Sequence, residues 1–285
     1  MARHVTRTWY RIALGRPSGP PVVVAAAGEH MGAAVAAAER HTPGAFAIAA
    51  ELALDSDIPL GESLGKSMVV ALGVATDVPV FHWPVGVLPQ ISRAALASEV
   101  TRGWLVRPHD DLLVIEAQTY ASDLTDVFLG LIERLPSADN LEVRILPHFE
   151  DTGTAEVWLT SRLDARRILR FLDDHDEELL GNGHLELSIY VRALHATLRL
   201  TEHKTVVWLA GDRGLEADVR RWLGELAVPE LPASEPLVTV KDAPHFHYRP
   251  ARSRDRKKLG DELYRQRLRR VDTVRPEARA PRARD

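Results

Sequence analysis

The loop Asp55–Ser67 contains the spacing that comes closest to a phosphate-binding motif. Gly65-Lys66-Ser67 matches the end of a Walker A loop, whose backbone amides and lysine hold phosphates. That motif needs a glycine five positions before Gly65, but Leu60 stands there and Gly61 comes one position too late. We therefore predict an ordinary polar loop. A nucleotide-responsive or catalytic protein that uses Asp55–Ser67 is the alternative.

Gly28 and Gly32 follow the short apolar segment Val22–Ala27, a position where dinucleotide-binding folds have their first turn. The spacing here is Gly-x-x-x-Gly, whereas the dinucleotide fingerprint is Gly-x-Gly-x-x-Gly. Close packing of a helix against a strand explains the small residues equally well. We predict no cofactor at this turn.

Two of the twelve histidines have a spacing that suits metal binding. His245 and His247 flank a single residue, so in a strand both imidazoles lie on the same face. Two ligands do not complete a site, and the chain has no His-Glu-x-x-His helix. We therefore predict no metal site. His175 lies on the apolar side of a predicted helix and is expected to be a partly buried core residue.

The chain shows no recognisable set of catalytic residues. It contains no cysteine, which excludes a thiolate nucleophile, a thiolate metal site and a disulfide. It also lacks the Gly-x-Ser-x-Gly elbow of many hydrolases. We therefore predict no catalytic, cofactor-binding or metal-ligating residues, and the sequence favours a protein that is not an enzyme.

The strongest signal is an asymmetry of charge. Residues 241–285 contain fifteen Lys or Arg and seven Asp or Glu, a net charge of +8 in a chain whose total is −4, so residues 1–240 carry −12. A basic tail on an acidic body indicates a binding partner or a tail that docks on its own body. The predicted partner-binding residues are Arg252, Arg254, Arg256, Lys257, Lys258, Arg265, Arg267, Arg269 and Arg270.

The acidic run Asp173–Glu178 is the densest cluster of negative charge. We expect its carboxylates to lie on the solvated surface of a helix, and the run is a plausible contact for the tail at low salt. Few aromatic residues accompany the tail's arginines, which weakens the case for stacking on single-stranded nucleic acid. Nucleic-acid binding through the tail is the second alternative.

The elements that position these groups are clearest in the centre of the chain. Apolar residues from Leu124 to Leu135 recur at helical spacing, which predicts an amphipathic helix. Strict alternation at Leu185–Val191 predicts a half-exposed strand. Asp164 is expected to cap a helix. The order in residues 109–228 is β-α-β-β-α-β followed by β-α, which is the order of a ferredoxin-like split βαβ fold.

The predicted architecture is α+β. A small ββαβ-type N-terminal lobe covers residues 1–108, and a ferredoxin-like lobe covers 109–228. Residues 229–285 form a Pro-containing linker and an Arg-rich tail, which we expect to be flexible because it has few large apolar residues. A chain ending near Pro236 is therefore expected to unfold cooperatively.

The predicted function is a non-enzymatic adaptor or accessory subunit that binds a protein partner in a bacterial multi-protein system. The bacterial source is expected from abundant Ala and from a preference for Arg, since only five of the thirty-six basic residues are Lys. No apolar run reaches the roughly 18 residues needed to span a bilayer. We expect a cytoplasmic protein with no membrane span.

Overall fold

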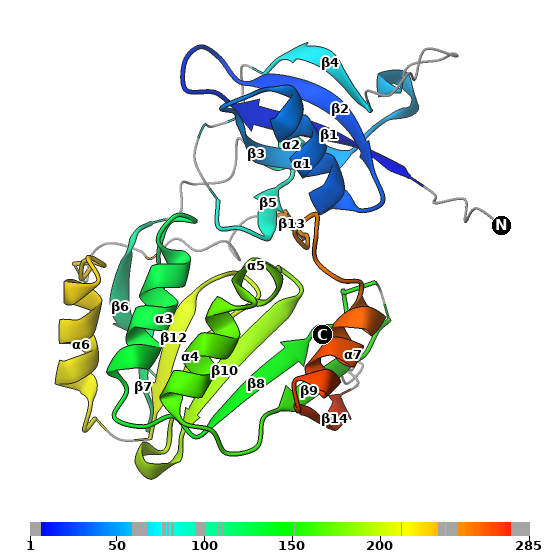
Figure 1. The fold of residues 1–285 in the computed structure, drawn as a ribbon. Coiled ribbons are helices and arrows are strands. Elements are labelled where there is room, and N and C mark those ends of the chain that lie inside the picture. The colour runs from blue at the N-terminus through cyan, green and yellow to red at the C-terminus, as the bar shows by residue number, and fades with distance from the viewer. Residues whose placement is uncertain are drawn as a thin grey trace, which may run out of the picture.

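The computed structural model shows two lobes, one above the other, with the strand β13 (His245–His247) between them (Figure 1). The structure describes residues 7–58, 68–75, 78, 80, 83–94, 101–107, 109, 111–150, 152–211, 213–232, 237 and 244–274. Each lobe has its own antiparallel sheet and its own apolar core. The predicted α+β class is confirmed.

The N-terminal lobe is a four-stranded sheet in the order β3-β1-β2-β4 with α1 packed on one face. Ala-rich α1 has high helix propensity, and the imidazole of its N-cap His30 accepts a hydrogen bond from Ala33 N. The elements are β1 (Thr8–Gly15), β2 (Val22–Gly28), α1 (Met31–His41), β3 (Phe46–Leu52), a 3₁₀ turn (Asp55–Asp57), β4 (Val69–Val74), β5 (Val87–Pro89) and α2 (Ile91–Ala94).

The C-terminal lobe is an eight-stranded sheet in the order β14-β9-β8-β10-β11-β12-β7-β6. Alternation along its strands puts apolar side chains on the helix-covered face and polar ones such as Ser188 on the other. The strands are β6 (Gly103–Arg107), β7 (Leu113–Gln118), β8 (Asn140–Ile145), β9 (Ala155–Leu159), β10 (Leu185–Val191), β11 (Ala196–Leu200), β12 (Val206–Ala210) and β14 (Arg269–Val274).

Helices cover one face of this sheet and complete its core (Figure 1). The predicted amphipathic helix is α3, and the predicted cap Asp164 accepts a hydrogen bond from Arg167 N at the start of α4. No helix that the structure describes has both the length and the apolar character needed to cross a bilayer. The helices are α3 (Leu124–Arg134), α4 (Ala165–Asp173), α5 (Asp176–Leu179), a 3₁₀ turn (Arg192–Leu194), α6 (Glu216–Glu225) and α7 (Arg256–Arg265).

The predicted elements are present, with α5 added before β10 and β11 added between β10 and β12, but the ferredoxin-like arrangement is not confirmed. β9 and β10 do form a split pair, but the strand between them is β8, and β10, β11 and β12 separate β8 from β7. The physical reason is that β10, β11 and β12 are joined by short turns and pair with one another as antiparallel neighbours. This three-stranded unit occupies the edge of β8 and keeps β7 away from it.

The tail was predicted to be flexible, yet its described part is packed. Leu259 and Leu263 of α7 and the following Leu268 are each 1% exposed and belong to the core of the C-terminal lobe. β14 pairs with β9 and extends the eight-stranded sheet. Apolar residues that are sparse in the sequence are concentrated on the side that faces the core, so the segment is ordered despite its charge.

Candidate functional site: a histidine cluster between the lobes

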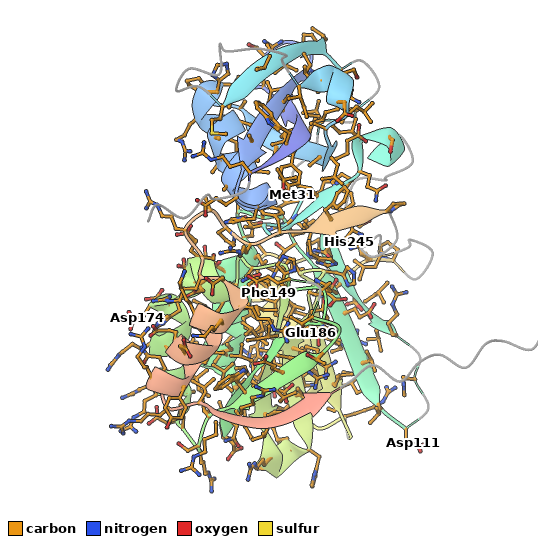
Figure 2. All side chains as sticks on the ribbon, turned by 90° about the vertical axis from the view of Figure 1, so that its right-hand side faces the viewer. Met31, Asp111, Phe149, Asp174, Glu186 and His245 are labelled. Carbon is orange, nitrogen blue, oxygen red and sulfur yellow. The ribbon has the colours of Figure 1, made fainter. Side chains whose placement is uncertain are left out.

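The strand β13 carries two histidines into the junction between the lobes. Its backbone pairs antiparallel with β5, and Phe246 and Tyr248 pack against the core of the N-terminal lobe. Because side chains alternate along a strand, His245 and His247 point to the opposite side from Phe246. Figure 2 shows His245 between Met31 of the upper lobe and Phe149 of the lower one.

The turn between β11 and β12 brings a third histidine to the same place. Thr201 closes this turn by accepting hydrogen bonds from Lys204 N at its carbonyl oxygen and from Thr205 N at its hydroxyl oxygen. Lys204 adopts a left-handed φ of 61°, is fully buried, and donates a hydrogen bond from Nζ to Asn182 O at 2.7 Å. This anchor holds the preceding Glu202 and His203 against residues 244–248, a strap that contains β13.

Two further histidines come from loops at the ends of β8 and β10. His148 lies in the loop after β8, and its Nδ1 is 2.9 Å from Nδ1 of His184, which precedes β10. The ring of Phe149 stacks on His184 at a centroid distance of 4.7 Å and an angle of 8°. His148 also stacks on His247 with centroids 4.4 Å apart. The five described imidazoles that meet in these contacts come from four chain segments.

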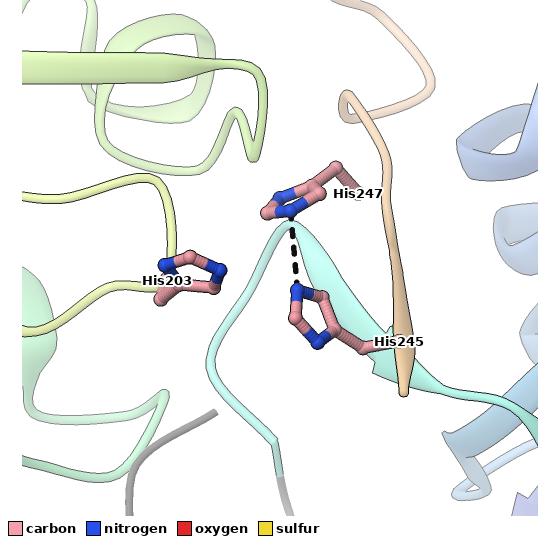
Figure 3. Close-up of side chains that lie close together, drawn as sticks. All are labelled: His203, His245 and His247. Carbon is pink, nitrogen blue, oxygen red and sulfur yellow. Dashed lines mark hydrogen bonds between the residues drawn. The ribbon is translucent and has the colours of Figure 1, made fainter. Parts of the chain in front are cut away.

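The imidazole nitrogens lie within reach of a shared ion. Nε2 of His245 and Nε2 of His247 are 3.1 Å apart, and His203 faces them from the neighbouring turn (Figure 3). One ligand atom each from His203, His245 and His247 lies within 4.8 Å of the other two. His148, Glu202 and His247 form a second group whose ligand atoms also lie within 4.8 Å of one another. The two groups share His247.

Burial keeps two of these imidazoles neutral. Burial, followed by the neighbouring His148, His245 and His203, lowers the pKa of His247 to about 2. Burial and then His148, Lys204 and Arg249 lower the pKa of His184 to about 3. A neutral imidazole is the form that binds a metal ion.

Two charged groups beside the cluster are also perturbed. Burial raises the pKa of Glu202, but the hydrogen bond with His148 and the nearby His203 and His245 outweigh it, so the pKa lies below its usual value. Burial, partly offset by Glu202 and Glu186, lowers the pKa of Lys204 to about 7. The site therefore has a carboxylate on one side and a buried amine behind it.

Close backbone contacts hold the strap in place. Tyr248 N donates to Gly86 O at 2.8 Å, and Gly183 N donates to Tyr248 O at 3.0 Å, which links the strap to both lobes. A Cβ at Gly183 would lie 1.9 Å from Gly86 O, and one at Gly32 would lie 1.8 Å from Arg249 O. Glycine is required where backbones approach this closely. The histidines of β13 are therefore positioned before any ligand binds.

The spacing of the nitrogens suits a transition-metal ion. A His nitrogen binds zinc at about 2.0–2.1 Å, which puts two ligands of a tetrahedral ion about 3.3 Å apart. The 3.1 Å between His245 and His247 is close to that value. Imidazole suits zinc, copper, iron and nickel better than calcium or magnesium, which prefer oxygen ligands.

The fold and the site define a two-lobed α+β protein with a histidine cluster at the junction of its lobes. Comparisons with family models, with curated proteins and with solved structures find no match to this chain. Its function is therefore inferred from the chemistry of its own residues.

Two of the predicted partner-binding residues make contacts with other parts of the same chain. Arg256 is 6% exposed and donates to Leu146 O and Thr154 O, each at 2.7 Å. Arg254 pairs with Glu178 and lies 3.1 Å from Glu262. Glu178 is buried, so the prediction of a solvated carboxylate is wrong for this residue, while the predicted contact of the tail with the acidic run is present.

The other predicted partner-binding residues lie at the surface. Lys257 and Lys258 form ion pairs within or at the start of α7, with Asp261 and Asp255 respectively. Arg265 pairs with Glu262, and Arg270 lies 3.8 Å from Glu156. The residues of this set for which the structure describes an exposed side chain are Arg252, Lys257, Lys258, Arg265, Arg267, Arg269 and Arg270.

The two glycine-containing segments have different outcomes. Residues 59–67 of the loop Asp55–Ser67 lie outside the described residues, and Asp57 accepts a hydrogen bond from Leu54 N. At the other segment, β2 is antiparallel to β1 and β4, so the parallel unit of a dinucleotide fold is not present there. Gly28 and Gly32 allow close packing against the start of α1 and against Arg249.

Sequence reasoning found only part of the cluster. The alternation in β13 correctly predicted that His245 and His247 share a face. His148, Glu202 and His203 are single residues in loops, far from β13 in the chain, and no local spacing links them to it.

Proposed function

We propose that the protein binds a divalent transition-metal ion of the zinc, cobalt or nickel type at the junction of its lobes, with His203, His245 and His247 as ligands. The observation that carries the proposal is the convergence of these three imidazoles, with ligand atoms within 4.8 Å of one another. Three histidines are a common ligand set for such an ion.

Neighbouring residues support this assignment. A histidine that binds a metal through one nitrogen usually presents the other to a carboxylate or a carbonyl. Nδ1 of His203 faces Glu202 Oε1 at 3.7 Å, which is an arrangement of this kind. His247 departs from this pattern, because its Nδ1 is buried with no hydrogen-bond partner among the described residues. A bound ion would add coordination energy to a junction that glycine contacts already hold together.

Metal titration of the full-length protein tests the proposal. Protein freed of metal with a chelator should bind one equivalent of Co²⁺ or Zn²⁺, and the free energy of unfolding should rise. The gain is about 2.7 kcal/mol when free metal is at 100 times its dissociation constant. Thermal unfolding and metal content after gel filtration are the measurements.

Matched variants separate the site from adventitious binding. His247→Gln should abolish the bound equivalent and the stabilisation. His41→Gln, which changes an exposed histidine at the end of α1, should preserve both. Equal binding by the two variants, or no bound equivalent in the unmodified protein, would leave a cluster of hydrogen-bonded histidines and no metal site.

The role expected from charge, that of an adaptor or accessory subunit, stays a prediction. The exposed side chains of Arg252, Arg267 and Arg269 favour it, because none of the described residues forms an ion pair with them. The internal contacts of Arg254 and Arg256 weaken the argument from the net charge of the tail. The nucleotide and nucleic-acid alternatives also stay predictions.

A further inference from the structure

The three proposed ligands do not complete the coordination shell of a four-coordinate metal ion. Zinc sites with three protein ligands keep a position for water or substrate, whereas structural sites are closed by four. Here the three ligands are neutral imidazoles, so an ion held by them retains its full charge of about +2.

The side chains closest to this set are engaged with each other. Nε2 of His148 lies 3.4 Å from Glu202 Oε2, and its Nδ1 lies 2.9 Å from His184. Ligand atoms of Glu202, His148 and His247 lie within 4.8 Å of one another. His203 and His245 are not members of that group. Within the described residues, a fourth protein ligand therefore requires these contacts to break.

The three proposed ligands are partly accessible, and both signs of charge lie around them. His203, His245 and His247 are half-buried, and 22% of the His203 side chain is exposed. Arg249 follows the strap and adds a positive charge close enough to affect His184. Glu202 contributes one negative charge, which does not neutralise a divalent ion.

From this arrangement we infer that the metal ion keeps an open coordination position that binds a small anionic ligand, such as a carboxylate or an inorganic anion. The inference rests on the proposed function, because it needs the ion. The anion would bind the metal directly and would replace a water molecule, so no covalent bond of the protein changes.

Spectroscopy of the Co²⁺-loaded full-length protein tests this inference. The visible absorption of Co²⁺ depends on the number and geometry of its ligands. Sodium azide and sodium acetate should each change these bands in a saturable way, with one anion per metal, while Co²⁺ remains bound. A response to azide alone also supports the inference and confines the ligand to small inorganic anions.

Three results would contradict the inference, and each has a different meaning. Stable Co²⁺ binding with a spectrum that neither anion changes would show that protein ligands close the shell, and would overturn the inference while leaving metal binding intact. An anion response that appears only in Glu202→Gln would identify Glu202 as the closing ligand and would overturn it too. Failure of the protein to bind Co²⁺ would overturn the proposed function, and this inference with it.

Discussion

Arg256 shows how a single buried residue links the tail to the site. Its guanidinium donates to the carbonyl oxygens of Leu146, Phe149 and Thr154 and lies beside the Glu156 carboxylate. Those carbonyls belong to the segment between β8 and β9, which also carries His148. Arg256 was predicted to bind a partner because of its positive charge. It instead holds in place the loop that carries His148 of the histidine cluster.

Replacing Arg256 should destabilise the protein strongly. Arg256→Met would leave three carbonyls without this donor and would weaken the pairing of Glu156, at a cost of about 3 kcal/mol in the free energy of unfolding. Lys257→Met is the matched control, because its side chain is 87% exposed, and should change stability by at most about 0.5 kcal/mol. Urea denaturation measures both. A loss below about 1 kcal/mol for Arg256→Met would mean that water replaces the guanidinium.

At the scale of elements, the spacing of apolar residues predicts a helix or strand reliably where one side of that element faces a core. α3 buries Leu124, Val127, Phe128, Leu131 and Ile132, which are the residues that its sequence pattern selects. The tail is a contrasting case. It was expected to be flexible, but it contains α7, which ends at Arg265, and Arg267 adopts a left-handed φ of 66°. Hydrogen bonds from Arg267 N to Tyr264 O and from Leu268 N to Leu263 O close the helix end.

Phe128 gives a direct test of the core beneath α3. Its side chain is 0% exposed, so Phe128→Ala should lower the free energy of unfolding by about 3–5 kcal/mol through the cavity that it leaves. Leu131→Asp should be worse, because it buries an unpaired charge. Glu133→Ala, at an exposed position of the same helix, is the control. Chemical denaturation measures these losses, and a loss near 1 kcal/mol for Phe128→Ala would contradict the assignment.

At the scale of the whole molecule, packing and charge act together in the C-terminal segment. The expectation that a chain ending near Pro236 folds normally does not fit the structure. Such a chain loses β13 and α7 as well as β14, and with them Leu259, Leu263 and Leu268 of the core. Each buried leucine is worth about 2–5 kcal/mol. Their sum approaches the total stability of a typical domain, about 5–15 kcal/mol.

Truncation and salt should therefore separate packing from charge. A chain ending at residue 236 should lose its cooperative unfolding transition, whereas one ending at residue 274, which keeps every described element, should retain it. Amides of α7 should stay protected from hydrogen exchange at about 1 M salt, where the Debye length is about 3 Å. Protection that disappears as salt rises would show that charge alone holds the segment.

The sequence by itself determined the local elements of this protein. The alternation of Leu185–Val191, the apolar side of α3 and the cap at Asp164 depend on neighbours within a few residues, so the chain displays them directly. The same local reasoning predicted that His245 and His247 lie on one face of a strand. It also detected the charge of the tail, which is a property of composition.

Only the tertiary structure decided which elements meet. The order of strands in the eight-stranded sheet depends on pairings between distant segments, and local periodicity is the same for any order. The histidine cluster has the same origin, because His203 reaches β13 only when a buried lysine fixes its turn and glycines let the strap approach both lobes. Long-range packing creates that environment, and a chemical site assembled from single residues has no signature along the chain.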